Sequence, residues 1–501
     1  MYVVTWAFIS WLAVPAFDAY GDMVENYAWG QTWTWGSFKH PPLFAWIVKV
    51  WFAVFPTQVW AYYLLSYLNA AAGVLGIVWL ARLCLPEDTS AARRDAFLMA
   101  AALFAMLSFP YSNLAAKFNA DTILLSVWPW TAYAFFAALH ARDAWRRWSF
   151  SVLFGVLAAA AMLSKYYSAL LLVSLAIVSL SNRGYRRWYR TPYPYVAVAV
   201  GALALLPHVL WESRVHFPFL GYLESKIDPH VDFGRVVLFL MSGIYYLPLS
   251  WLAWLLWRSR FSSRTRQPAA SRVPLGALVL VCVLPAVITA SFNLFARVHL
   301  TTHWAIPAWF ALPVLMAVWL LPVIDDDFPW ARLTSSLAIF WCVLIAAAIA
   351  YAVVLSGRGD PKYSLARQEM VKAIESRFAA RFPSQELSWV GGSWPESGAV
   401  AFFGERHPRA LPGLPDGSRA IVNPYPAWRE RWGAILCYTA DSYGREGSHN
   451  TPCEQETRDW LHARERAVDE ETLTYRAEGW RYIRAQPKNI TVFWIPPTRR
   501  P

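Results

Sequence analysis

Charged residues are scarce in this 501-residue sequence: Asp, Glu, Lys and Arg make up only 16% of it, against about 25% in a typical soluble domain. Hydrophobic residues make up 57% and gather in long runs before about residue 356. The runs are continuous, without the polar–apolar alternation of barrel strands. Since only helices and closed barrels satisfy the backbone in lipid, the pattern predicts a polytopic α-helical membrane protein.

Several nucleotide and metal motifs are also missing. The sequence has no P-loop, no G-x-G-x-x-G, no H-E-x-x-H and no metal-type cysteine pair, which argues against ATP-driven chemistry. No clear set of metal ligands is visible, and the sequence leaves a requirement for a divalent metal open. Only five cysteines occur, and Cys84, Cys282 and Cys342 lie in or beside apolar runs. Cys437 and Cys453 lie in the polar C-terminal region, where they could form a disulfide in an oxidising compartment or remain two free thiols.

About eleven apolar runs are long enough to be membrane helices. The N-terminal run lacks the basic start and the small-residue cleavage site of a secretory signal, so we expect it to be the first of these helices. The expected helices are 2–17, 58–83, 96–112, 121–140, 149–164, 166–182, 193–212, 236–257, 275–295, 304–322 and 334–356. The runs 149–164 and 166–182 meet at Lys165, which predicts two short or tilted helices that meet at one membrane face.

Arginine is distributed unevenly among the loops, so the net charge of +12 indicates membrane topology and contact with anionic lipid more than nucleic acid binding. Every second loop is arginine-rich; these residues are Arg93, Arg94, Arg142, Arg146, Arg147, Arg183, Arg186, Arg187, Arg190, Arg258, Arg260, Arg264, Arg266 and Arg272. The positive-inside rule places these loops in the cytoplasm. The stretch 22–43, Asp121, Lys165 and the tail from 357 then lie on the external side.

The tail, residues 357–501, has a soluble composition and predicts a small external α/β domain. The stretch "SLARQEMVKAIESRFAARF" has helical periodicity, while "AVAFFG", "GAILCYT" and "ITVFWIPP" indicate strands. We therefore divide the chain into a transmembrane domain, 1–356, whose first external loop is 18–57, and this tail domain.

Ionisable side chains near a membrane are costly and are functional candidates by default. Asp18, Asp22, Glu25 and Asp121 share the external face, where one carboxylate could serve as a general base; alternatively they cap helices, and Asp121 follows Asn119 in a pattern that suits a cap. The cations expected on this face are Lys39, His40, Lys117, Lys165, Arg214, Lys226, Arg235, Arg297 and His303. They could hold a phosphate or could reach toward lipid headgroups. Lys165, between two apolar runs, needs a partner.

The stretch "DMVENYAWGQTWTWGSFKHPPL" combines a carboxylate, an aromatic-rich segment and a double proline. It resembles the first external loop of the GT-C membrane glycosyltransferases, in particular the protein O-mannosyltransferase-like and lipid A aminoarabinose transferase-like group. Three further stretches resemble the group in the same order: "KFNADTILLSVWP", "GVLAAAAMLSKYYSALLL" and "THWAIPAWFALPVL". The resemblance covers residues 1 to about 356.

The resemblance implies an enzyme that moves a sugar from a polyprenyl-phosphate carrier to an envelope acceptor. That acceptor would be lipid A, lipopolysaccharide, another glycolipid or a protein at the periplasmic face of a bacterial inner membrane. Asp22 and Asp121 would be catalytic, and the implied substrate-binding residues are Glu25, Lys39, His40, Lys165, Tyr166, Arg297 and His303. Lys39 departs from relatives, which often have an acid there. Two other functions remain open: a transporter or flippase of a lipid-linked sugar, and a non-catalytic membrane assembly factor.

Overall fold

The computed structural model describes residues 1–14, 17–18, 21–227, 232–261, 271–322, 324, 330–356, 366–411, 413–415, 425–438, 451–479 and 482–498. Arg264 and Arg266, two of the predicted cytoplasmic arginines, lie outside these ranges. The chain forms two compact units. The first comprises Met1–Ala7, Lys39–Leu43 and Leu64–Ile339, and the second comprises Phe8–Phe38, Phe44–Tyr63 and Phe340–Pro501.

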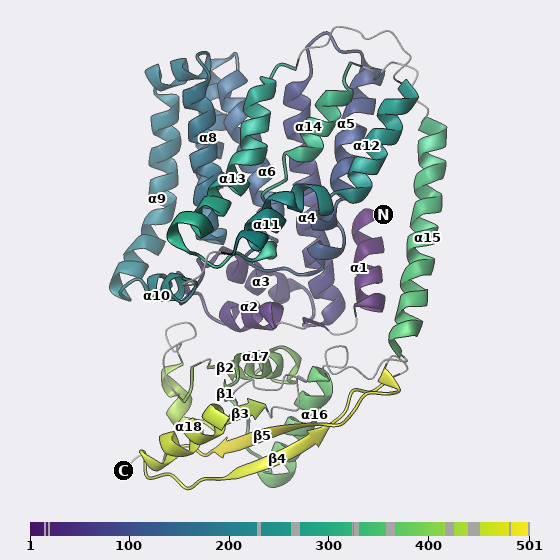
Figure 1. Ribbon diagram of the computed structural model, residues 1–501. Coiled ribbons are helices and arrows are strands. Elements are labelled where there is room, and N and C mark those ends of the chain that lie inside the picture. Colours follow the sequence, from purple (N-terminus) through teal and green to yellow (C-terminus); the bar gives the residue numbers. More distant parts are fainter. Residues whose placement is uncertain are drawn as a thin grey trace. The chain divides into compact units, whose positions relative to one another are not determined.

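The first unit is a helical bundle (Figure 1). Its helices, some of which begin or end in the second unit, are α1 (Tyr2–Ala13), α4 (Val59–Cys84), α5 (Ala91–Met106), α6 (Leu124–His140), α7 (Ala144–Ser164), α8 (Ala169–Ser181), α9 (Tyr193–Arg214), α10 (Pro218–Glu224), α11 (Phe233–Tyr245), α12 (Pro248–Phe261), α13 (Leu275–Ala296), α14 (Leu312–Leu320) and α15 (Trp330–Ser356). Each of the eleven predicted apolar ranges therefore contains helix.

Length and apolarity separate these helices into groups. In the described part of the chain, α4, α7, α9 and α13 are each long and apolar enough to cross a membrane alone. Two bent pairs, α5 with the 3₁₀ turns Phe109–Ala116 and α11 with α12, raise the number to six. The remaining predicted spans are shorter or less apolar helices by this criterion, so all eleven predicted ranges contain helix, but fewer qualify as complete spans on their own in the described part of the chain.

Small residues let the bundle helices approach closely, as is common between membrane helices. On α4, a Cβ atom at Gly73 would lie 2.2 Å from the carbonyl oxygen of Leu125 on α6. On α7, a Cβ atom at Gly155 would lie 2.4 Å from the carbonyl oxygen of Ala197 on α9. Any larger residue at these two glycines would push the neighbouring backbone away.

The tail domain is a five-stranded sheet with helices on both faces (Figure 1). The strand order is β2 (Arg409–Ala410), β1 (Trp389–Gly392), β3 (Gly433–Tyr438), β5 (Lys488–Ile495) and β4 (Glu470–Tyr475). Both pairs among β2, β1 and β3 are parallel, and both pairs among β3, β5 and β4 are antiparallel. Helices α16 (Arg367–Arg381) and α17 (Trp394–Phe403) cover one face, and α18 (Thr451–His462) covers the other. The predicted α/β fold is confirmed.

The prediction of a strand at "AVAFFG" was wrong. Residues Ala399–Phe403 belong to α17, and the helix is buried through most of its length. Because Ala399–Phe403 is a short run of apolar residues only, it shows no amphipathic period that would distinguish a buried helix from a buried strand. The helix begins beside Pro395, a residue favoured in the first helical turn.

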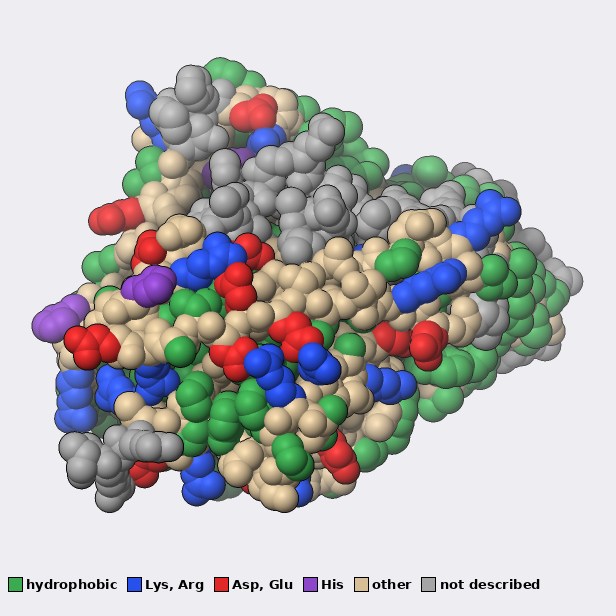
Figure 2. Space-filling model, turned by 90° about the horizontal axis from the view of Figure 1, so that it is seen from below, with side chains coloured by type: hydrophobic (Ala, Val, Ile, Leu, Met, Phe, Trp, Pro, Cys, Tyr) green, Lys and Arg blue, Asp and Glu red, His purple; other side chains and the backbone are tan. Residues whose placement is uncertain are grey.

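Ion pairs are frequent on the surface of the tail domain. Arg377 pairs with Glu471 at 2.6 Å, and Arg458 with Glu470 at 2.8 Å. Figure 2, which views the molecule from below, shows side chains of both signs interspersed. This mixed charge suits a domain in water.

The two tail cysteines form the disulfide that the sequence left open. Cys437 on β3 and Cys453 on α18 are bonded, with their Cα atoms 5.8 Å apart. Both residues belong to the apolar layer between α18 and the sheet. The disulfide therefore attaches the helix to the central strand.

The first loop packs on the tail domain within the second unit. Helix α2 (Asp22–Gly30) lies against α17, where a Cβ atom at Gly398 would be 3.0 Å from the carbonyl oxygen of Val24. Gln31, just after α2, accepts a hydrogen bond from the backbone of Ala410 at 3.0 Å and donates to the carbonyl of Pro408 at 2.9 Å. Helix α3 (Leu43–Val54) follows the double proline of this loop.

Candidate active site

Lys165 lies where α7 ends, as the sequence predicted. Its backbone is extended, and the 3₁₀ turn Tyr166–Ser168 then leads into α8. The break lets the side chain leave the bundle axis while the helices on both sides keep their apolar surfaces. Lys165 is 9% exposed, so its ammonium requires a polar partner.

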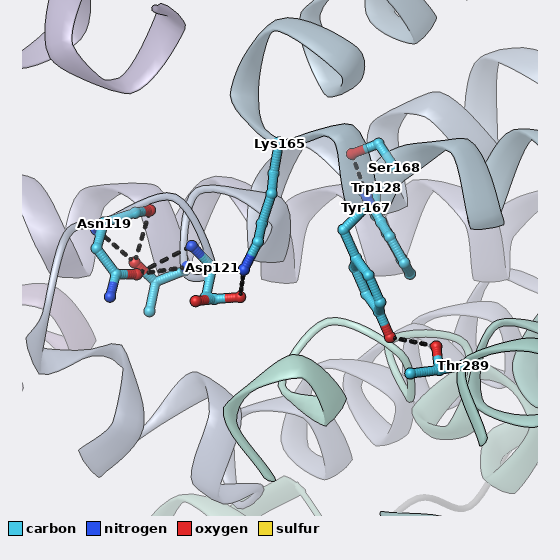
Figure 3. A network of polar contacts seen from close by, with 8 residues as sticks. Asn119, Asp121, Trp128, Lys165, Tyr167, Ser168 and Thr289 are labelled. Carbon is cyan, nitrogen blue, oxygen red and sulfur yellow. Dashed lines mark hydrogen bonds and ion pairs between the residues drawn. The ribbon is translucent and has the colours of Figure 1, made fainter. Parts of the chain in front are cut away.

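That partner is Asp121. The Lys165 ammonium forms an ion pair with Oδ1 of Asp121, whose side chain is 18% exposed (Figure 3). The loop before α6 holds Asp121 in place: the side-chain carbonyl of Asn119 accepts hydrogen bonds from the backbone N–H groups of Asp121 and Thr122, each at 3.0 Å. The capping alternative for Asp121 is therefore wrong, because Asn119 makes those bonds and the Asp121 carboxylate points to Lys165.

Aromatic rings surround this ion pair. The Lys165 nitrogen lies 5.8 Å from the centre of the Trp304 ring and 6.0 Å from that of Tyr167. Tyr167 stacks on Trp128, and its hydroxyl lies 2.7 Å from Oγ1 of Thr289 (Figure 3). Rings with fixed orientation keep the ammonium from moving away and attract it through their π faces.

A second group of cations lies close to Lys165. The His40 ring is 6.0 Å from the Tyr222 ring on α10, and the Lys226 nitrogen lies over Tyr222 at 5.0 Å. Desolvation lowers the pKa of His40 well below its ordinary value, and the positive charges of Lys39, Lys165 and Lys226 lower it further. We name Lys39, His40, Lys165 and Lys226 the cation cluster, because the charges of the three lysines act on the His40 ring.

Two more predicted carboxylates lie on α2 in the second unit. Asp22 begins α2 and is half-buried, whereas Glu25 is buried at 6% exposure. Asp18 has a structural role: its Oδ2 accepts hydrogen bonds from the backbone N–H groups of Met23 at 2.7 Å and Val24 at 2.9 Å. It thereby caps α2 and orients Asp22.

The remaining predicted residues have different surroundings. Arg297 ends α13 in a left-handed conformation and is exposed. His303 is exposed in the 3₁₀ turn Thr302–Ala305, beside Trp304. Neither makes a hydrogen bond or ion pair with Asp121 or Lys165 among the described residues. Tyr166 turns instead toward α9, where its hydroxyl donates to Glu212 at 2.8 Å.

Sequence reasoning missed Trp304, His208 and Glu212. His208 and Glu212 are spaced four residues apart in an apolar helix, and two ionisable groups on one face of a membrane helix were a signal that could have found them. In the described ranges, no three or more His, Cys, Asp or Glu side chains are arranged to hold a metal ion.

Known proteins share this fold and part of this sequence. A family model described as dolichyl-phosphate-mannose-protein mannosyltransferase matches residues 39–211. The crystal structure of ArnT from Cupriavidus metallidurans bound to undecaprenyl phosphate is 17% identical, with a TM-score of 0.53 over 98% of this chain and 96% of that chain. ArnT from the same organism in the apo state is 14% identical over the same shares, also with a TM-score of 0.53. No curated protein sequence matches this chain.

Fold and family match together indicate a class: this chain is similar to the multi-pass membrane glycosyltransferases of GT-C type. Within that class, its fold is that of the two ArnT structures, and its sequence match is to the mannosyltransferase model. The recognition drawn from the first loop and the three later motifs is therefore confirmed.

Proposed function

We propose that the chain transfers a sugar from a polyprenyl-phosphate carrier to an acceptor hydroxyl at the periplasmic face of a bacterial inner membrane. The acceptor is lipid A, lipopolysaccharide, another envelope glycolipid or a protein. The observation that carries this proposal is the cation cluster of Lys39, His40, Lys165 and Lys226. Undecaprenyl phosphate is the ligand of the ArnT structure with this fold.

The chemistry follows from the charges. As the bond between the sugar and its phosphate breaks, the electron pair and negative charge go to the leaving polyprenyl phosphate. Fixed cations stabilise that charge where it develops. Lys165 has three donor hydrogens and gives one to Asp121, so it retains donors for a phosphate oxygen.

The acceptor hydroxyl must lose its proton as its oxygen attacks the sugar. In this proposal Asp22 removes the proton, and Glu25 helps to orient the acceptor. Asp18 supports the role of Asp22 because it fixes the first turn of α2, on which Asp22 lies. A carboxylate can act as such a base if it comes within hydrogen-bond reach of the hydroxyl. Asp121 acts by holding Lys165 in position for the phosphate.

Donor titration tests the cation cluster directly. Lys165→Ala and Lys226→Ala should each weaken binding of undecaprenyl phosphate to the purified protein by about tenfold or more, as expected for loss of a charge-assisted hydrogen bond. Arg297→Ala is the matched control, because Arg297 is exposed and makes no hydrogen bond or ion pair with the cluster among the described residues. Unchanged affinity in both lysine variants would contradict the phosphate site.

Comparison of envelope glycolipids by mass spectrometry, with and without the gene, tests the transfer itself. We expect loss of a species whose mass exceeds its precursor by one sugar residue. The Asp22→Asn protein should fail to restore it. An unchanged glycolipid profile, with normal binding of undecaprenyl phosphate, would favour the transporter alternative.

A further inference from the structure

Tyr166, His208 and Glu212 form a second polar cluster. His208 and Glu212 are four residues apart on α9, so both side chains lie on one face. The Tyr166 hydroxyl donates to Oε1 of Glu212 at 2.8 Å and lies 2.9 Å from Nε2 of His208. Because this hydroxyl has a single hydrogen, which Glu212 accepts, Nε2 of His208 must carry its own hydrogen and donate to Tyr166.

The second carboxyl oxygen of Glu212, Oε2, lies in a different environment from Oε1. Glu212 is 3% exposed, and its Oε2 is buried without a hydrogen-bond partner among the described residues. Leaving a polar oxygen buried and unsatisfied costs about 1–3 kcal/mol, and more for a charged group. A ligand that donates a hydrogen bond to Oε2 would recover that free energy.

Glu212 also lines a cavity of about 210 Å³. Glu212, His208 and Tyr166 supply its polar lining, and its apolar lining consists of Met162, Leu205, Val209, Phe217 and Phe219. Sites for drug-sized molecules begin at about 300 Å³, so this cavity suits a lipid headgroup or one sugar ring. Its described lining contains no Lys or Arg, and the Glu212 carboxyl group favours a hydrogen-bond donor over a phosphate.

The cavity also adjoins a surface suited to lipid. Leu203, Leu206 and Leu210 on α9 are 69%, 47% and 47% exposed, as expected where a helix meets acyl chains. Val209 is 50% exposed and lines the cavity as well. A lipid molecule could therefore place its headgroup in the cavity while its chains remain in the bilayer.

We propose that Glu212, His208 and Tyr166 form a binding site for a hydrogen-bond-donating lipid headgroup, either the ammonium of an aminophospholipid or a sugar hydroxyl of a glycolipid. Both ligands would donate to Oε2 of Glu212, and the faces of the surrounding rings would pack against the group. This site would bind a hydrogen-bond donor, whereas the cation cluster would bind a phosphate. The proposal for this site does not depend on the proposed sugar transfer.

Native mass spectrometry of the full-length protein with added lipids tests the site. The probes are phosphatidylethanolamine, monoglucosyl diacylglycerol and phosphatidylcholine, whose methylated headgroup has no N–H donor. The wild-type protein should retain one of the first two about tenfold more strongly than phosphatidylcholine, and Glu212→Gln should reduce that preference to about twofold or less. A preference for phosphatidylethanolamine identifies the ammonium, and one for the glucolipid identifies the hydroxyl.

Two further variants make the result decisive. Glu224→Gln changes an exposed carboxylate on α10 outside the cavity lining and should keep the preference. Val209→Trp fills the cavity from its lipid side, keeps Glu212, and should remove the preference even if Glu212→Gln does not fold. Equal retention of all three lipids by the wild-type protein would overturn the proposal. So would a preference that survives both Glu212→Gln and Val209→Trp.

Discussion

The Lys165 ammonium is paired with the carboxylate of Asp121, 44 positions earlier in the chain. Lys165 lies at a helix break and Asp121 in a loop held by the Asn119 side chain, so two irregular segments of the bundle fix the pair. An irregular backbone of this kind is tolerated at membrane depth only where it is buried in protein or lines a cavity. The arrangement holds a positive charge ready for an anionic ligand.

Substitutions that break the ion pair between Asp121 and Lys165 should show that the two residues stabilise the protein jointly. Asp121→Asn and Lys165→Met should each destabilise the protein by about 3 kcal/mol, since removal of one partner leaves a charge in a poorly solvated site. The double variant should be less unstable than the sum of the two changes. Thermal unfolding in detergent, followed by tryptophan fluorescence, measures all three; additive losses would show that the pair is not coupled.

Asp22 and Asp18 should respond differently to the same substitution. Asp22→Asn should retain wild-type stability and lose sugar transfer, because the proposed role of Asp22 is chemical. Asp18→Asn weakens two hydrogen bonds to the start of α2 and should cost about 1–2 kcal/mol of stability. Transfer assays with purified protein, normalised to the folded fraction, separate the effects. Wild-type turnover by Asp22→Asn would exclude it as the base.

Much of the fold was visible in the sequence because lipid imposes a simple rule on the backbone. Every apolar range predicted before residue 356 contains helix, and the Lys165 break was predictable because a charge there cannot be left in hydrocarbon. Lengths were harder to predict: α11 and α12 form one bent pair around Pro248, and such bends depend on packing between helices. The apolar segment Ala399–Phe403 of α17 was mistaken for a strand because so short a run has no helical period.

The sequence predicted the candidate site less completely than the fold, because the spacing of residues along the chain does not show which loops lie next to one another. The sequence placed Asp121 and Lys165 on one face, and the structure pairs them. It grouped Arg297 and His303 with them equally, yet both are exposed without a hydrogen bond or ion pair to that pair among the described residues. Tyr166 was expected beside the donor, but its hydroxyl turns to Glu212 through an interaction that only helix packing could determine.

His40 should make donor affinity depend on pH. Its pKa is held well below the ordinary value of about 6.5, so the ring is neutral at pH 7. A bound phosphate would raise this pKa, and binding would therefore take up a proton. Linkage then requires donor affinity to increase as pH falls through the raised pKa of His40 in the bound state, by up to tenfold per pH unit.

The control for this prediction is His40→Gln, which cannot titrate. Calorimetric titration of undecaprenyl phosphate between pH 5 and 8 should show a flatter pH profile for the variant than for the wild-type protein. Proton uptake can be read independently from the dependence of binding enthalpy on buffer ionisation. Identical profiles for the two proteins would remove His40 from the phosphate site.

The disulfide between Cys437 and Cys453 should report both stability and topology. Closing a loop of 16 residues stabilises a domain by about 3 kcal/mol in the chain-entropy model, so Cys437→Ala with Cys453→Ala should lower the melting temperature of the tail domain.

In intact, non-reduced cells the thiols of Cys437 and Cys453 should resist a maleimide reagent, and they should react after reduction and unfolding. A variant that lacks Cys84, Cys282 and Cys342 restricts labelling to this pair. Labelling of both thiols without reduction would contradict an oxidising location. Activity of a cytoplasmic reporter fused after Pro501 would go further, because it would reverse the orientation of the tail and exclude transfer at the periplasmic face.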